Sequence, residues 1–130
     1  MTFCTAVNCM DGRVQLPVIN YLMERFDVEY VDSVTEPGPV RVLSDAADPL
    51  KRSSVFDRVT VSTGKHGSNL IAVVAHFDCT GNPLSEDEQM RQLERSVDVL
   101  AAGFPDAFIV GLWVDAEWTV SERLSREPAR

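Results

Sequence analysis

Apolar runs alternate along the chain with stretches of helical spacing, which indicates a repeating strand–helix pattern. Residues 70–75 are continuously apolar, as is typical of a central parallel strand that is buried on both faces. Residues 14–26 instead carry apolar side chains every three or four positions, which predicts an amphipathic helix. The same two patterns predict further strands at 3–7, 28–34 and 107–114, and further helices at 50–63 and 86–102.

The predicted elements follow the order strand, helix, strand, helix, strand, helix, strand. Parallel strands that are joined by helical crossovers form a three-layer α/β domain. We therefore expect an open, mainly parallel four-stranded sheet that is flanked by helices and spans residues 1–120. A short further element is expected near 118–120, and the largely polar residues 121–130 are expected to form a C-terminal tail.

Composition and charge argue against some classes of binding partner. The chain has 130 residues, which is enough for one domain, and a formal net charge of −8. Nucleic acid and anionic membrane surfaces would repel such a protein. No apolar run approaches the roughly 20 residues of a membrane-spanning helix, and the first residues lack the pattern of a signal peptide. We expect a cytoplasmic protein with neither nucleic acid nor membrane as a partner.

Two short motifs place soft metal ligands after predicted strands. Cys9 follows the first strand, and His76 and Cys79 follow the third. The carboxyl ends of parallel strands meet at one edge of a sheet, where ligands bind. Two thiolates and an imidazole are typical zinc ligands, and three protein ligands leave a fourth position open for catalysis. The sequence therefore predicts a zinc site that is formed by Cys9, His76 and Cys79.

Two charged residues, Asp11 and Arg13, accompany Cys9. Asp11 can accept a hydrogen bond from a zinc-bound water or bind zinc itself, and Arg13 can hold Asp11 by a charge-assisted pair. The alternatives are a purely structural ion pair between Asp11 and Arg13, and two ordinary buried cysteines in place of metal ligands.

The two motifs together resemble those of the β-class carbonic anhydrases, Cys-x-Asp-x-Arg at residues 9–13 and His-x-x-Cys at 76–79. The likeness extends over residues 3–114 and is closest to a short branch of that superfamily. The resemblance implies zinc held by Cys9, His76 and Cys79, and a catalytic dyad of Asp11 and Arg13. It further implies attack of zinc-bound hydroxide on a small-molecule substrate, carbon dioxide, to give bicarbonate in a homodimeric lyase.

The chain also departs from the family pattern. The eight residues before Cys9 do not match the N-terminal helical arm of typical members, and Glu-Pro-Gly-Pro at 36–39 stands near the place of their Arg-Asn-Ala-Gly segment. Superfamily members also hydrolyse carbon disulfide or carbonyl sulfide. Two alternatives to carbon dioxide hydration therefore remain: hydrolysis of another small electrophile, and a non-catalytic zinc-binding domain whose site is closed by Asp11.

Overall fold

Five strands form one sheet in the order β2-β1-β3-β4-β5. The computed structural model describes residues 2–130 of the chain. Strands β1 to β4 are parallel, and β5 runs antiparallel to β4 at one edge. The α/β fold class is confirmed, with one strand more than the four expected. The strands span Phe3–Asn8 (β1), Tyr30–Thr35 (β2), Leu70–His76 (β3), Phe108–Val114 (β4) and Val120–Arg126 (β5).

The expected polar tail at 121–130 is wrong for more than half of its length, because β5 extends to Arg126. Residues of β5 pair with β4 from Val114↔Val120 to Ile109↔Arg126. A Cβ added to Gly111 of β4 would lie 2.7 Å from the Leu124 side chain, so that Leu124 occupies the space that this glycine leaves. Backbone pairing with β4 thus orders a polar segment that has little apolar patterning of its own.

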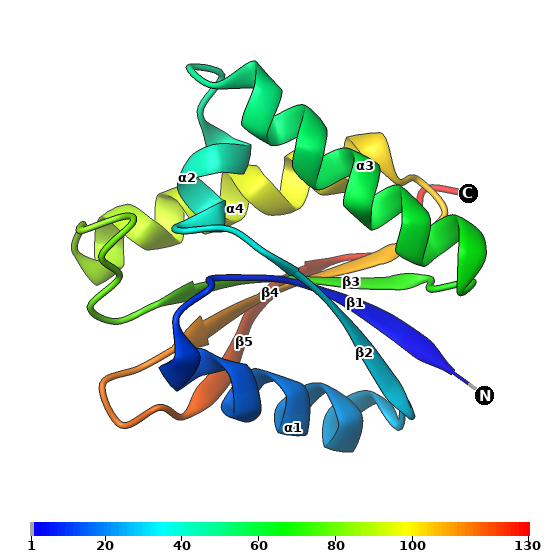
Figure 1. Ribbon diagram of the computed structural model, residues 1–130, viewed down its shortest axis with the longest axis horizontal. Helices are drawn as coiled ribbons and strands as arrows, with labels where there is room; N and C mark the ends of the chain where they lie inside the picture. Colours follow the sequence, from blue (N-terminus) through cyan, green and yellow to red (C-terminus); the bar gives the residue numbers. More distant parts are fainter. Residues whose placement is uncertain (1) are drawn as a thin grey trace.

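Helices cover both faces of the sheet (Figure 1). One turn of 3-10 helix, Gly12–Val14, leads into α1 (Gln15–Phe26), which lies alone on one face. The other face carries α2 (Pro39–Ser44), α3 (Pro49–Lys65) and α4 (Glu86–Gly103).

Polar side chains and prolines begin the helices on the second face. The Asp48 side chain accepts a hydrogen bond from the backbone N–H of Lys51, and Ser85 accepts one from Glu88. The sequence did not predict α2, because Pro37-Gly38-Pro39 is typical of a break. Pro39 stands in the first turn of α2, where a residue without an N–H is tolerated.

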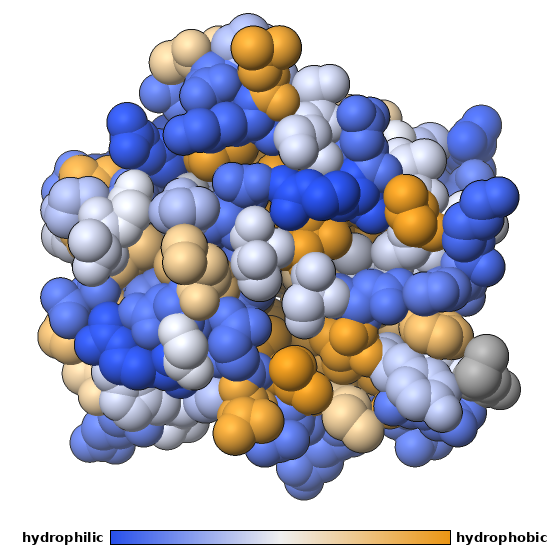
Figure 2. Space-filling view, in the orientation of Figure 1, coloured by the Kyte–Doolittle hydropathy of each residue, from blue (hydrophilic) through white to orange (hydrophobic). Residues whose placement is uncertain are grey.

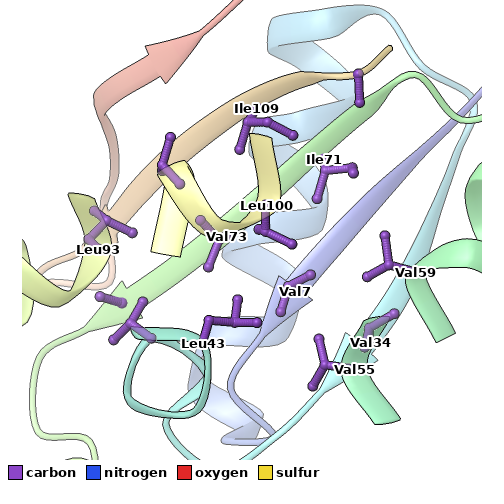
Figure 3. Close-up of a cluster of buried hydrophobic side chains, with 14 of the residues drawn as sticks. Val7, Val34, Leu43, Val55, Val59, Ile71, Val73, Leu93, Leu100 and Ile109 are labelled. Atoms are coloured by element: carbon purple, nitrogen blue, oxygen red, sulfur yellow. The ribbon is translucent and has the colours of Figure 1, made fainter. Parts of the chain in front are cut away.

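Two apolar clusters hold the layers together, one on each face of the sheet. Figure 3 shows the first, in which Val7 and Val73 of the sheet lie against side chains such as Leu43, Leu100 and Val59 of the covering helices. The second includes residues of α1 together with Cys4, Cys9 and Cys79. All seven residues of β3 are buried, as the continuous apolar run predicted. The residues after β1 and β3 are therefore anchored directly in the core.

Within residues 2–130, no helix combines the length and the apolar character that crossing a membrane requires.

Candidate metal centre

The side chains of Cys9, His76 and Cys79 converge at the carboxyl ends of β1 and β3. These strand ends lie toward the left of Figure 1. Their ligand atoms all lie within 4.8 Å of one another, and the two sulfurs are 4.0 Å apart. Only 4% of Cys9, 1% of His76 and 4% of Cys79 is exposed. Two sulfurs and one imidazole nitrogen in this arrangement can hold a single metal ion.

The hydrogen bonding of His76 leaves one ring nitrogen for a metal. Nδ1 lies 2.8 Å from the backbone carbonyl oxygen of Phe77. Because a carbonyl only accepts, Nδ1 carries the proton and Nε2 keeps a free lone pair. Nε2 is buried without a hydrogen-bond partner among the described residues. A buried acceptor without a partner is unfavourable unless a cation binds it, so His76 fits the role of a metal ligand.

The two thiols are electrostatically linked. Hydrogen bonding from the Cys79 thiol lowers the pKa of Cys9, with further help from the backbone N–H groups of Gly38 and Asp11. The same contact with the Cys9 sulfur raises the pKa of Cys79, which holds the proton that the pair shares. A metal cation bound between the two sulfurs would replace this proton, because cysteines bind metal as thiolates and metal binding releases their protons.

Two amide side chains build the loop that presents Cys9. Buried Asn8 accepts a hydrogen bond from the Cys9 N–H (2.8 Å) and donates one to the Val14 carbonyl (3.2 Å). Gln15 Nε2 donates to the carbonyls of Cys9 (2.7 Å) and Asp11 (3.0 Å). Neither amide is predictable from the sequence, because their partners are backbone atoms that no side-chain motif reveals.

The loop after β2 crosses the loop after β3 at two glycines. A Cβ added to Gly81 would lie 2.7 Å from Pro37, and one added to Gly38, where φ is +62°, would lie 2.8 Å from Asn82 Cβ. Behind this crossing, the backbone N–H groups of Gly81 and Asn82 lower the pKa of Cys79 against the opposing effect of Cys9. The Pro-Gly segment at 37–38 therefore forms one wall of the centre.

Asp11 and Arg13 form an ion pair beside the three ligands. Arg13 Nη2 lies 2.7 Å from Asp11 Oδ2, and Nε lies 3.1 Å from both carboxylate oxygens. Hydrogen bonding from Arg13 lowers the pKa of Asp11 to about 2. Among the described residues, the group of mutually close ligand atoms consists of the two cysteines and the histidine and does not include the Asp11 carboxylate.

Arg13 has two further neighbours, Asp78 and Trp118. Asp78 Oδ2 lies 3.3 Å from Arg13 Nη1. The Trp118 ring lies under the Arg13 guanidinium, with Arg13 Cζ 4.6 Å from the ring centroid. No pattern in the sequence predicts these contacts, because the first depends on the path of the loop after β3 and the second on the turn between β4 and β5.

A cavity of about 640 Å³ lies next to Cys79. Phe77, Leu84 and Trp113 give it apolar walls, while Glu86 and Gln89 contribute polar ones. A small neutral molecule can thus be accommodated beside the candidate metal centre.

The family model described as "Putative carbonic anhydrase" matches residues 1–123 of the chain. The chain belongs to this family. The match covers both segments that contribute the converging cysteines and histidine. A comparison with curated proteins finds no significant match.

Solved β-carbonic anhydrases share the fold of this family member. Isoform I from Trichomonas vaginalis aligns with a TM-score of 0.62 at 16% identity, over 92% of this chain and 80% of that one. A tetrameric enzyme from Sordaria macrospora aligns with a TM-score of 0.61 at 10% identity, over 95% of this chain and 81% of that one. CafA of Aspergillus fumigatus aligns with a TM-score of 0.57 at 13% identity, over 92% of this chain and 74% of that one. At these identities the likeness establishes the fold alone.

Proposed function

We propose that the chain binds zinc through Cys9, His76 and Cys79 and hydrates carbon dioxide reversibly to bicarbonate. The observation that carries this proposal is the buried group of two sulfurs and one orphaned imidazole nitrogen, in a member of the carbonic anhydrase family. A set of soft sulfur and imidazole ligands favours zinc over magnesium or calcium. Zinc bound there would supply a Lewis acid that makes water a nucleophile near neutral pH.

The Asp11–Arg13 pair favours a centre with an open fourth position. Both Asp11 oxygens already accept hydrogen bonds from Arg13, and the carboxylate stands outside the group of close ligand atoms. A structural zinc site would need a fourth protein ligand, and moving Asp11 inward would break these hydrogen bonds. We therefore prefer a catalytic site to a non-catalytic zinc domain that is closed by Asp11.

Asp11 is suited to orienting a reacting water molecule. Its pKa of about 2 keeps the carboxylate ionised at neutral pH, where it accepts hydrogen bonds. A carboxylate with so low a pKa is a weak base, so it would not retain the proton that hydration releases. In this proposal Asp11 aligns the water, Arg13 holds Asp11, and the proton passes on to solvent.

The experiment is stopped-flow hydration of carbon dioxide by the wild type and by Asp11→Asn, with zinc content measured on the same samples. We expect the variant to keep its zinc and to lose hydration activity by about 10²-fold or more, as is common when a positioned group is removed. Asp57→Asn, on the exposed face of α3, is the matched control and should hydrate like the wild type. Equal rates for the wild type and Asp11→Asn would contradict the role of Asp11.

The cavity beside Cys79 favours hydrolysis of another small electrophile as the second candidate. Its Phe77, Leu84 and Trp113 walls suit an apolar molecule such as carbon disulfide or carbonyl sulfide. Product analysis with carbon dioxide, carbonyl sulfide and carbon disulfide would separate the two functions. Faster turnover of a sulfur compound than of carbon dioxide would favour the hydrolase.

A homodimer in the cytoplasm is also part of the proposal. Three large apolar side chains are exposed on α1 and β2: Leu16 (68%) and Met23 (40%) of α1, and Tyr30 (49%) of the edge strand β2. Figure 2 shows apolar side chains gathered over α1. Free thiols as metal ligands suit a reducing compartment. Light scattering should give twice the chain mass for the wild type and a smaller mass for Leu16→Glu; a monomeric wild type would contradict the dimer.

A further inference from the structure

Arg13 links the two loops that form the candidate metal centre. On the side of the loop after β1, its Nε and Nη2 contact Asp11. On the side of the loop after β3, Nη1 donates to Asp78 Oδ2 (3.3 Å) and Nη2 donates to the Asp78 carbonyl (3.2 Å). The hydrogen-bonding edge of the guanidinium is thus shared between two residues that are 67 positions apart.

One flat face of the same guanidinium rests on Trp118, with Cζ 4.6 Å from the ring centroid. The indole also packs against the apolar cluster that contains Cys9, Val14 and Cys79. Trp118 therefore touches both Arg13 and the core that anchors two of the proposed ligands.

The turn between β4 and β5 is built to present Trp118. The Asp115 side chain accepts hydrogen bonds from the backbone N–H groups of Glu117 (2.9 Å) and Thr119 (3.0 Å). The Trp118 N–H donates to the Asp115 carbonyl (3.0 Å), and Trp118 itself has a φ of +62°. This left-handed conformation is uncommon for a bulky residue and persists only where the surroundings impose it.

We propose that Trp118 is a positioning residue, which fixes the plane of the Arg13 guanidinium and thereby the orientation of the Asp11 carboxylate beside the metal position. The catalytic consequence rests on the proposed function; the contact between the two side chains does not.

Exposure explains why Arg13 needs such a support. Its side chain is 44% exposed and that of Asp78 is 67% exposed, so water competes for their hydrogen bonds. Stacking on an aromatic ring restrains a planar guanidinium without using any of its N–H donors. All of the donors that face Asp11 consequently remain available to it.

The test compares Trp118→Leu with the conservative Trp118→Phe. Leucine retains apolar bulk but no ring, whereas phenylalanine retains a ring on which the guanidinium can stack. Phe26→Leu is the matched control, because Arg25 lies over the Phe26 ring at the same 4.6 Å, at the other end of α1. All variants are made in the full chain, and urea unfolding identifies any general loss of stability.

The first readout is the ¹⁵N NMR signal of the Arg13 Nε–H, which is assigned with Arg13→Lys and does not require activity. We expect a dispersed, slowly exchanging signal in the wild type, in Trp118→Phe and in Phe26→Leu. In Trp118→Leu the signal should move to the position of a free arginine and exchange faster. An unchanged signal in Trp118→Leu would overturn the proposal, whether or not the protein hydrates carbon dioxide.

The second readout is a double-mutant cycle on the hydration rate. Trp118→Leu should lower kcat/KM by about two- to fivefold, which is the size expected for losing one partly exposed cation–π contact, with much of the activity restored in Trp118→Phe. In an Arg13→Ala background the same replacement should have no further effect. Additive losses would overturn the proposal, because Trp118 would then act independently of Arg13. Absence of hydration in the wild type would instead reject the proposed function, and the NMR signal would still decide the role of Trp118.

Discussion

The Sγ atoms of Cys9 and Cys79 lie 4.0 Å apart, although 70 positions separate the two residues in the chain. They meet because β1 and β3 are neighbouring parallel strands, so the segments that follow them leave the same edge of the sheet. His76, the last residue of β3, adds its imidazole at this edge. The candidate metal centre is thus a product of sheet topology, with each half supplied by a separate short motif.

Replacing Cys79 with serine tests whether both sulfurs hold metal. A neutral hydroxyl is a poor zinc ligand, so we expect the zinc content to fall from about one ion per chain to nearly none. Cys4→Ala is the control, since Cys4 is fully buried in the core and outside the ligand group. Elemental analysis after desalting measures both. Full zinc in Cys79→Ser, or its loss in Cys4→Ala, would contradict the assignment.

Asn8→Ala tests the hydrogen bonds behind Cys9. The variant removes the acceptor of the Cys9 N–H and the donor to the Val14 carbonyl, both in the buried interior. We expect zinc affinity to fall by about 10- to 100-fold, as for other residues that orient metal ligands. Competition with a chromogenic chelator measures it. Asn20→Ala, on the exposed side of α1, should bind zinc as the wild type does; equal affinities for all three proteins would show that Asn8 does not support the site.

Much of the fold follows from local patterns in the sequence. The apolar run at 70–75 has the length of a buried strand, and Ser85 with three acidic residues after it marks the start of α4. The convergence of Cys9 with His76 and Cys79 could likewise be predicted, because parallel strands place their carboxyl ends together.

The features that the sequence did not predict depend on contacts between distant segments. β5 is polar and is ordered by pairing with β4, and α2 is only six residues long. The position of Trp118 under the Arg13 guanidinium depends on the hairpin that β5 forms with β4. The close approach of the two loops at Gly38 and Gly81 could not be predicted either, because a Pro-Gly pair does not indicate which other loop packs against it. These elements surround the centre, so the sequence predicted the three candidate ligands and the Asp11–Arg13 pair but not the loops and side chains around them.

Gly81→Ala tests the crossing of the two loops. A methyl group would meet the backbone and side chain of Pro37 at 2.7 Å, so we expect a loss of about 1–3 kcal/mol in the free energy of unfolding. Gly64→Ala is the contrasting variant, since it lies on exposed α3 with nothing within 4 Å of the added Cβ. It should gain about 0.5–1 kcal/mol because alanine favours helix. Urea unfolding measures both, and equal effects would contradict the close approach of the loops.

The Asp11–Arg13 pair predicts a pH dependence of stability. Hydrogen bonding from Arg13 lowers the pKa of Asp11 from 3.8 to about 2, so at low pH the unfolded chain takes up the proton first. The resulting stabilisation is complete above about pH 4 and is lost as the pH falls through about 2. Urea unfolding of metal-depleted wild type and Asp11→Asn should therefore show a difference that shrinks below pH 4. A difference that stays constant down to pH 2 would show that the pair does not shift this pKa.

X-ray absorption at the zinc edge of the purified, zinc-loaded protein tests the central claim most directly. The proposed centre predicts two sulfur neighbours at about 2.3 Å, one imidazole nitrogen at about 2.0 Å and one additional light atom from solvent. Asp11→Asn should leave this spectrum unchanged at neutral pH, because Arg13 holds the Asp11 carboxylate outside the group of close ligand atoms. A protein that binds no zinc, or a spectrum that changes in Asp11→Asn, would contradict a three-residue site with an open fourth position.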